Sequence, residues 1–358
     1  MFSHSDPVVN RVLSTWAPRL VVQGVDYNDL AVAAERIVSW DDWLPVWSAI
    51  GAGHEERAER FAADGQQVSA AEAYGLASMA YHFGCNSSPA DLEAYTAAHQ
   101  RRVDTYRRAA PWLDPPAERH EVAFDTAILP GYLRLPPGVE DPPVVVIVSG
   151  LESTKEEHRT MEEVFLDRGM ATFAFDGPGQ GETWFDLGMI VEFERAVVAV
   201  LDHLKGVGSV DHDRIGLFGP SMGGYLSSRA AAVDDRIRAV AVSGASYDRW
   251  HMIEKLQNPF DFSRNAHAYR TRDIEELTEI LRASTLQDLA KDITCPLLVV
   301  AGTADFVPMA HPERLAAEAS GPTRLVVIEG GNHVCNNRPF LYRPLVGDFL
   351  AAELTAQS

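Results

Sequence analysis

A serine flanked by glycines carries the strongest chemical pattern in this sequence. Residues 219–224 read Gly-Pro-Ser-Met-Gly-Gly, after a short apolar run and before a stretch of helical pattern. A serine on a sharp strand-to-helix turn projects its hydroxyl from the edge of a sheet, and glycines on both sides let strand and helix approach each other. The pattern predicts Ser221 as a nucleophile. An ordinary glycine-rich turn is the alternative interpretation.

A serine hydroxyl attacks a carbonyl carbon only when a base takes its proton, and that base needs a partner that orients it. His333 ends a Gly-Gly-Asn-His segment after a predicted strand, and Asp305 follows the strand before it. Because sites in parallel sheets gather at the carboxyl ends of strands, we expect these side chains to meet Ser221 there. The competing histidine is His311, which lies at the start of a predicted helix.

Acyl transfer through a serine also needs two backbone N–H groups that face the developing negative charge. The residue after the nucleophile, Met222, begins a predicted helix and is expected to supply one of them. The loop after the apolar run 144–148 contains Gly150 and Leu151. We expect the Leu151 N–H to be the second donor of this oxyanion hole.

These positions depend on an alternation of strands and helices that begins near residue 144. Such alternation is typical of an α/β fold, with a mostly parallel sheet and helices on both faces. Strands are predicted at residues 144–148, 171–175, 215–218, 239–242, 297–301 and 325–328, and helices at 153–168, 192–204, 222–232, 311–319 and 339–354.

The chain before this alternation has a different pattern. Residues 27–108 have helical periodicity, with a capping box at 69–72 and a further helix opened by Pro89, Ala90 and Asp91. Prolines at 115 and 116 mark a boundary.

We therefore predict a helical N-terminal cap region over residues 1–115 and a catalytic domain over 116–358. A helical insertion is expected at about 246–290, where aromatic residues replace the strand pattern. A hairpin of residues 121–124 and 132–135, joined across Pro130 and Gly131, should precede the alternation.

Composition excludes several functional classes. The chain has 31 Lys and Arg against 51 Asp and Glu, a net charge of −20, which argues against binding nucleic acid or anionic lipid. No apolar run approaches the length of a membrane helix, and the N-terminus has no signal-peptide pattern. Three widely spaced cysteines indicate neither disulfides nor zinc, which favours the cytoplasm. The glycines of residues 177–181 lack nucleotide-binding spacing. Neither a cofactor nor a metal is expected, because the three catalytic side chains and the oxyanion hole contain all the required chemistry.

Four segments also resemble a known family. Residues 150–157, 168–172, 176–182 and 331–333 are similar to those of the α/β-hydrolase group that includes 2,6-dihydroxypseudooxynicotine hydrolase, fermentation–respiration switch esterases and fungal enzymes that shorten polyketide chains. The resemblance implies an α/β-hydrolase fold, the same three catalytic residues, a helical cap and a homodimer.

The resemblance also implies a fourth carboxylate after the sixth strand, for which Glu254 is the nearest match and Asp248 the alternative. A solvated helix charge is the other interpretation of Glu254. The sequence around it departs from the pyridine-cleaving relative.

Together these patterns predict a serine hydrolase that cleaves an ester or a β-dicarbonyl C–C bond of a bulky small molecule, as in polyketide or aromatic secondary metabolism. Aromatic residues of the insertion fit such a substrate, or a core. The alternative is a lyase on the same scaffold, in which the pair of His333 and Asp305 removes a proton and acetate or another acyloxy group leaves. A binding protein without catalysis is a third hypothesis.

Overall fold

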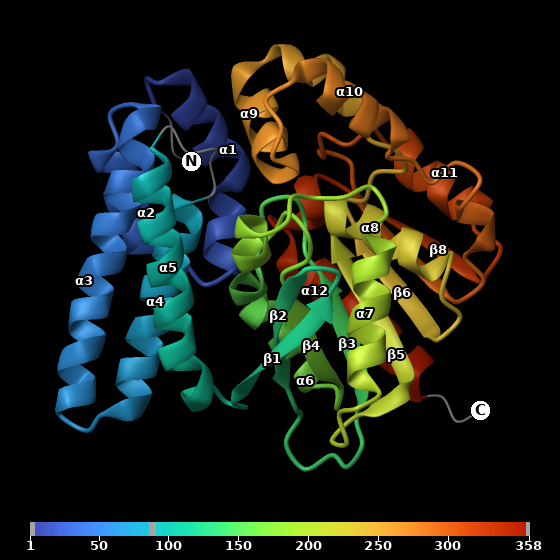
Figure 1. Cartoon of the computed structure of the whole chain (residues 1–358), viewed down its shortest axis with the longest axis horizontal. Coiled ribbons are helices and arrows are strands. Elements are labelled where there is room, and N and C mark those ends of the chain that lie inside the picture. The colour runs from blue at the N-terminus through green and yellow to red at the C-terminus, as the bar shows by residue number, and fades with distance from the viewer. Residues whose placement is uncertain (1–3, 86–90, 356–358) are drawn as a thin grey trace. The chain divides into compact units, whose positions relative to one another are not determined.

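The computed structural model describes residues 4–85 and 91–355. The chain forms two compact units (Figure 1). One contains Met1–Glu118 together with Glu156–Thr160, and the other contains Arg119–Lys155 and Met161–Ser358. Each unit has its own core. Among the described residues, no helix is both long enough and apolar enough to cross a membrane.

The first unit is helical. Its core is rich in aromatic side chains, and Trp43, Trp47, Tyr81 and Phe83 are almost fully buried. Helices α3 and α4 pack along each other, and α5 packs against α4. Its helices are α1 (Pro7–Val22), α2 (Tyr27–Arg36), α3 (Trp43–Ala63), α4 (Gln67–Gly84) and α5 (Leu92–Ala109).

Three helix starts in this unit can be compared with the sequence analysis. Helix α1 was not predicted, although Asp6 caps it by accepting hydrogen bonds from two backbone N–H groups. The predicted capping box at 69–72 is wrong, because the Ala70 N–H already donates to the Gln66 carbonyl and α4 begins at Gln67. Helix α5 is capped by Asp91, and the accompanying Pro89 and Ala90 lie outside the described residues.

A buried carboxylate explains why Glu156–Thr160 belongs to the helical unit. Glu157 accepts two hydrogen bonds of 2.7 Å from the Arg19 guanidinium and one of 3.1 Å from His82. Burial alone would raise the pKa of Glu157, but Arg19 and His82 outweigh it and hold that pKa well below its usual value.

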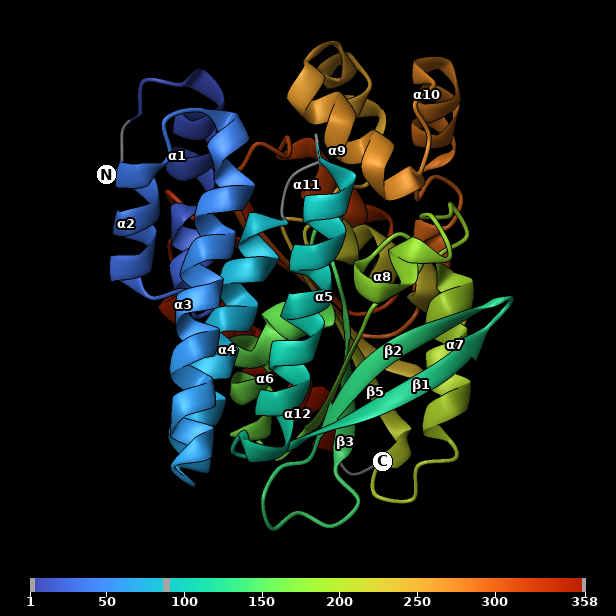
Figure 2. The same cartoon turned by 60° about the vertical axis from the view of Figure 1, so that its left-hand side comes forward.

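The second unit is built on an eight-stranded sheet of order β1-β2-β4-β3-β5-β6-β7-β8. Strand β2 runs antiparallel to β4, and all pairs from β4 through β8 are parallel. Figure 2 shows β1 and β2 as a long ribbon at one side of the sheet. The strands are β1 (Ala117–Phe124), β2 (Ala127–Arg134), β3 (Pro143–Val148), β4 (Ala171–Phe175), β5 (Asp211–Pro220), β6 (Ile237–Ser243), β7 (Leu297–Gly302) and β8 (Thr323–Ile328).

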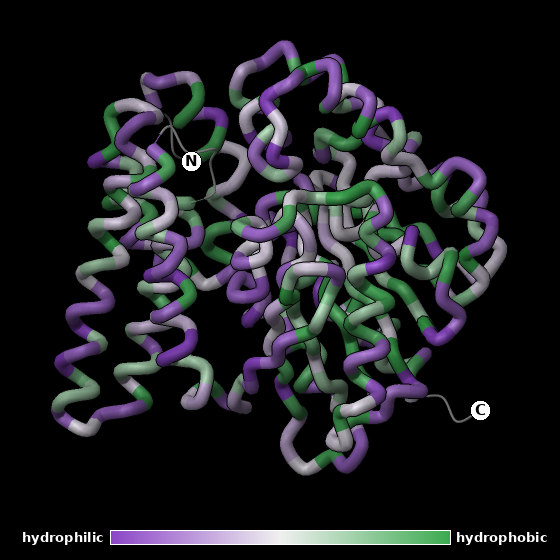
Figure 3. Tube along the Cα trace, viewed as in Figure 1, coloured by the Kyte–Doolittle hydropathy of each residue, from purple (hydrophilic) through white to green (hydrophobic). Residues whose placement is uncertain are grey.

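Helices cover both faces of this sheet. Alternate residues of β3 enter two separate cores: Val144, Val146 and Val148 join the core that contains α7 and α8, whereas Val145 and Ile147 join the core of α6 and α12. The central strands are therefore apolar on both faces, as Figure 3 shows by colour. The flanking helices are α6 (Arg159–Leu166), α7 (Glu194–Leu204), α8 (Met222–Ala231), α11 (Ala310–Glu318) and α12 (Pro339–Thr355).

The predicted hairpin is correct in kind but wrong in register. Its turn lies at Asp125, which has a φ of +48°, and not at Pro130 and Gly131, which are inside β2. Gly131 is needed there for packing, because a Cβ at this position would lie 2.6 Å from the Phe173 ring of the neighbouring strand.

The insertion follows β6. It contains the 3₁₀ turns η5 (Trp250–Met252) and η6 (Glu254–Gln257), then α9 (Pro259–Tyr269) and α10 (Ile274–Ala283). This is the helical segment predicted from the loss of the strand pattern.

Candidate active site

The turn between β5 and α8 holds Ser221 in a backbone conformation that residues other than glycine rarely adopt. Its φ is +59° and its ψ −126°, and its N–H donates to the Ser243 carbonyl over 2.8 Å. The neighbouring glycines make this turn possible. A Cβ on Gly219 would lie 2.3 Å from the Gly223 carbonyl oxygen, and a Cβ on Gly223 would lie 1.9 Å from that of Val148. The turn has the geometry of a nucleophile elbow.

Three side chains form a continuous hydrogen-bonded relay. His333 Nε2 lies 2.7 Å from Ser221 Oγ, and His333 Nδ1 lies 2.8 Å from Asp305 Oδ1. Since an ionised carboxylate only accepts, Asp305 places the imidazole proton on Nδ1 and leaves Nε2 to accept from the serine hydroxyl. Asp305 is nearly buried, with 4% of its side chain exposed against 18% for His333. The three residues that the sequence singled out follow β5, β7 and β8.

The turns that hold the acid and the base are packed through glycine. A Cβ on Gly302 would lie 2.1 Å from the Gly331 carbonyl oxygen. Gly244, which has a φ of +65°, would place a Cβ 3.1 Å from Asp305 Oδ2 and 3.3 Å from His333 Cε1. The backbone therefore approaches both side chains more closely than any residue with a side chain would permit.

The two expected oxyanion donors are backbone N–H groups that make no hydrogen bond with a described residue. Met222 is the first residue of α8, so its N–H has no acceptor within the helix. The Leu151 N–H makes no hydrogen bond in the described structure. The loop that contains it passes beside the serine, because a Cβ on Gly150 would lie 3.4 Å from Ser221 Cβ.

The two candidates for the additional carboxylate are not hydrogen-bonded to this relay. Glu254 is exposed on η6 and makes no hydrogen bond or ion pair with any described residue. Asp248 is buried and accepts a hydrogen bond of 3.0 Å from the Trp250 N–H. Neither carboxylate hydrogen bonds to Ser221 or His333.

Two side chains that the sequence analysis did not select lie beside the histidine. The Phe306 ring is 47% exposed and packs against His333, with 4.1 Å between ring centroids. Lys255 Nζ lies 4.9 Å from the centre of the Phe306 ring. Phe306 could have been selected from the sequence, because it directly follows Asp305. Lys255 could not, because it is far from Asp305 and His333 in the sequence.

The insertion is attached next to the oxyanion loop. Arg264 of α9 forms a two-bonded ion pair with Glu152, the residue after Leu151. His267, one turn further along α9, stacks on Trp184 with 4.2 Å between ring centroids. Nothing in the local sequence around Glu152 indicates a partner 112 residues away.

One cluster near the insertion has the composition of a metal site. Ligand atoms of Asp248, His251 and His311 lie within 4.8 Å of one another. However, His311 Nδ1 accepts a hydrogen bond of 3.1 Å from the Tyr247 N–H, whereas a metal-bound histidine donates from its second nitrogen. Burial, with nearby cationic groups, lowers the pKa of His251 to about 3. The arrangement therefore fits a neutral histidine pair better than a metal centre.

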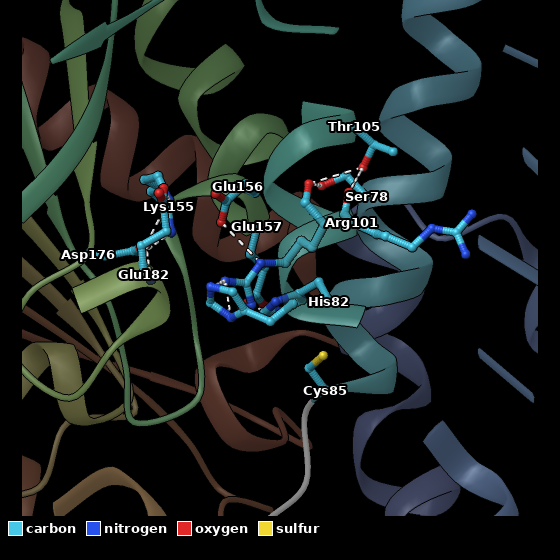
Figure 4. A network of polar contacts seen from close by, with 12 residues as sticks. Ser78, His82, Cys85, Arg101, Thr105, Lys155, Glu156, Glu157, Asp176 and Glu182 are labelled. Atoms are coloured by element: carbon cyan, nitrogen blue, oxygen red, sulfur yellow. Dashed lines mark hydrogen bonds and ion pairs between the residues drawn. The ribbon is translucent and has the colours of Figure 1, made fainter. Parts of the chain in front are cut away.

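A second group of carboxylates already faces a cation of the chain. Lys155 Nζ lies 2.7 Å from Asp176 Oδ2 and 2.6 Å from Glu182 Oε1 (Figure 4). The Lys155 side chain is completely buried. This ammonium group supplies the positive charge that a metal would otherwise bring to these two carboxylates.

The sheet order, the elbow after β5 and the Ser–His–Asp relay define an α/β-hydrolase. Comparison with known proteins agrees. The chain belongs to the FrsA-like esterase family, whose model matches residues 35–259. The fold and the enzyme class predicted from the sequence are thereby confirmed, as is the resemblance on which they partly rested.

Individual relatives cover nearly the whole chain. It is 33% identical to 2,6-dihydropseudooxynicotine hydrolase of Paenarthrobacter nicotinovorans, over 94% of this chain and 91% of that protein. It is 29% identical to the hydrolase LUC6 of a Fusarium species, over 87% and 86% of the two chains. The crystal structure of 2,6-dihydroxy-pseudo-oxynicotine hydrolase matches with a TM-score of 0.86 at 32% identity, over 95% of this chain and 96% of that one.

Proposed function

We propose that this hydrolase cleaves an ester, or a C–C bond next to a carbonyl group, in a bulky small molecule through a covalent acyl-serine. The observation that carries the proposal is the relay of two hydrogen bonds, 2.7 Å and 2.8 Å long, that joins Ser221 to Asp305 through His333. Such a relay removes the serine proton as the nucleophile attacks.

The chemistry proceeds in two halves. Ser221 Oγ bonds to the carbonyl carbon while its proton passes to His333 Nε2, and the N–H groups of Leu151 and Met222 hold the carbonyl oxygen as it becomes negative. When the tetrahedral carbon collapses, the leaving group departs with the proton from His333. A water molecule then gives His333 a proton and attacks the acyl carbon. Ser221 Oγ leaves with that proton from His333, which releases a carboxylic acid and restores both side chains.

The surface beside the relay favours a planar substrate with a polar oxygen. The exposed Phe306 ring offers an apolar face next to His333, and the Lys255 ammonium group lies above that ring. An aromatic or conjugated acyl group would stack on Phe306, while Lys255 would attract an anionic or enolic oxygen. The relative named for hydrolysis of a pseudooxynicotine derivative supports a small-molecule substrate.

For a C–C substrate the leaving atom is carbon, which must receive a proton. We propose, on the strength of the family resemblance, that Glu254 passes the proton held by His333 to this carbon, since Glu254 is accessible and lies next to Lys255 in the sequence. Glu254→Gln should then lower turnover of a β-diketone and leave ester cleavage unchanged. If Glu254→Gln cleaves the β-diketone and the ester at the wild-type rates, Glu254 is a solvated surface charge with no part in the reaction.

We propose, by analogy with the family, that the chain forms a homodimer. The cysteine pattern favours the cytoplasm, and the net charge of −20 argues against binding nucleic acid or anionic membranes, so a small molecule is the expected partner. Sedimentation of the purified chain tests the dimer.

A fluorophosphonate probe tests the proposed nucleophile. We expect one adduct by intact mass, mapped by peptide analysis to Ser221 and absent in Ser221→Ala. That variant should lose at least about 10⁴-fold in kcat on an ester or β-diketone that the wild type hydrolyses. Labelling elsewhere, or full turnover by a folded Ser221→Ala protein, would overturn the proposal.

Turnover in ¹⁸O-labelled water separates hydrolysis from elimination. Hydrolysis places the heavy oxygen in the released acid. If acetate or another acid leaves without it, the lyase mechanism based on His333 and Asp305 replaces the present proposal.

A further inference from the structure

The Leu151 N–H can serve as an oxyanion donor only if its peptide unit is turned toward the substrate. Because a peptide bond is planar and trans, the Leu151 N–H points opposite to the Gly150 carbonyl. Whatever holds the Gly150 oxygen therefore sets the direction of the Leu151 N–H. The loop contains no regular secondary structure that could do this.

The side chain of Gln180 holds that oxygen. Gln180 Nε2 donates hydrogen bonds of 2.8 Å to the Gly150 carbonyl and of 2.8 Å to the Ser149 carbonyl. Its Oε1 accepts a hydrogen bond of 3.0 Å from the Gly177 N–H. Gln180 is 2% exposed, so water does not compete for these bonds.

The chemistry of this contact specifies an amide. Two backbone carbonyls require two donors, and one backbone N–H requires an acceptor, which is the inventory of a glutamine side chain. Rotating the amide by 180° would turn an oxygen toward two oxygens and an NH₂ group toward an N–H. One orientation is therefore much more stable than the other.

The segment that carries Gln180 is itself held rigidly. A Cβ on Gly177 would lie 2.2 Å from the Phe193 ring, and one on Gly181 would lie 1.9 Å from Asp176 Oδ2. Asp176 also accepts from the Glu182 N–H and pairs with the buried Lys155. The glycine-rich segment 177–181, which lacks the spacing of a nucleotide loop, thus forms a closely packed base for one side chain.

We propose that Gln180 is a positioning residue of the oxyanion hole: its amide fixes the Gly150–Leu151 peptide so that the Leu151 N–H faces the oxygen of the reacting carbonyl. The inference rests on the proposed function, because it assumes that Ser221 attacks a carbonyl carbon. It adds a residue whose side-chain hydrogen bonds go to backbone groups and not to Ser221, His333 or Asp305.

The rate of fluorophosphonate labelling tests this assignment, since the phosphoryl oxygen of the probe enters the oxyanion hole. In Gln180→Met the side chain keeps its length but loses all three hydrogen bonds. We expect the maximal labelling rate to fall about 10- to 100-fold with an unchanged half-saturating probe concentration, less than the full loss of an oxyanion donor.

A second variant provides a pH readout that a merely structural residue would not give. In Gln180→Glu, burial beside two carbonyl oxygens raises the pKa of the introduced carboxyl, and its protonated form still donates one hydrogen bond. The labelling rate of this variant should therefore fall when the pH rises through that pKa. The wild type should show no such fall.

Thr183→Val is the matched control. The Thr183 hydroxyl lies three residues after Gln180, is equally buried and lies within hydrogen-bond distance of two backbone carbonyls, those of Asp176 and Ile128. Neither carbonyl belongs to the oxyanion loop. Its loss should lower the melting temperature and leave the labelling rate within twofold of wild type.

The outcomes are distinct. If wild type labels at Ser221 and folded Gln180→Met labels at the same rate, the inference is wrong and the proposed nucleophile stands. If Thr183→Val slows labelling as much as Gln180→Met, the effect is one of general stability and the inference is wrong as well. If the wild type does not label at all, the proposed function fails and the inference with it.

Discussion

The relay and the insertion lie in the same unit but are held together by different means. The turns that carry Ser221, Asp305 and His333 are fixed by backbone packed on backbone, with glycine wherever a side chain would collide. Helix α9 of the insertion has one backbone hydrogen bond to the rest of the unit, from the Met189 N–H to the Ala268 carbonyl, and otherwise depends on side chains, through the Arg264–Glu152 ion pair and the stack of His267 on Trp184. The comparison indicates that the relay is sensitive to added volume, whereas the insertion is sensitive to charge and pH.

The largest effect should come from adding one carbon atom to the turn that carries Ser221. In Gly223→Ala the new Cβ would lie 1.9 Å from the Val148 carbonyl oxygen, so strand β3 or helix α8 must move. We expect a loss of at least about 3 kcal/mol in the free energy of unfolding, together with the loss of Ser221 labelling. Thermal unfolding and the fluorophosphonate probe measure the two.

Gly208→Ala is the control for that substitution, because no atom lies within 4 Å of the added carbon. Its free energy of unfolding should change by less than about 0.5 kcal/mol. A folded Gly223→Ala protein that labels normally would show that backbone packing does not hold the elbow.

An intermediate effect should follow from removing a charge of the insertion. Arg264→Gln breaks the ion pair with Glu152, whose side chain is 14% exposed. Because Glu152 follows Leu151, we expect turnover to fall about threefold to tenfold, with little change in melting temperature, since partly exposed pairs contribute about 1 kcal/mol or less.

Arg282→Gln provides the matched comparison for Arg264. Arg282 also forms an ion pair within the insertion, with Glu279, but both side chains are more than half exposed. Turnover should stay at the wild-type value. If both variants behave alike, the ion pair with Glu152 has no special connection with the active site.

The smallest effect should be a pH dependence of helix α9. Burial lowers the pKa of His267 to about 4, from an ordinary value of 6.5. Above pH 6.5 the ring is neutral in both the folded and the unfolded state, and the full stability of α9 is present. As the pH falls from 6.5 toward 4, the unfolded state takes up the proton first, so α9 loses stability.

Hydrogen exchange measures this difference between regions. After correction for the intrinsic rate, peptides from Pro259–Tyr269 should exchange faster at pH 5 than at pH 7.5, whereas peptides from β5 should not change. His267→Gln should reduce the pH dependence of α9. An equal response of β5 would contradict the distinction between the regions.

Much of the fold could be predicted from the sequence because its patterns are local. The apolar run at 171–175 coincides with β4, and the helix predicted to start at Met222 begins there. The hairpin turn was misplaced because a Pro-Gly pair favours a turn locally, whereas Gly131 is required by the Phe173 ring on another strand. Local preference and tertiary packing disagreed, and packing prevailed.

For the site, the sequence by itself determined which residues could carry the chemistry. The spacing of glycines around Ser221 and the positions of Asp305 and His333 after strands are properties of short segments. The strained turn, the strand end and the loop each require particular residue types wherever they occur.

Only the tertiary structure decided what surrounds that chemistry. Gln180 meets a carbonyl 30 residues away, and Arg264 meets a carboxylate 112 residues away. Glu254 is exposed and has no hydrogen-bond partner within residues 4–85 and 91–355. Contacts of this kind depend on how helices and loops pack after the sheet has formed. A single sequence contains no periodicity or spacing that records them, because the two partners are brought together by the path of the whole chain between them.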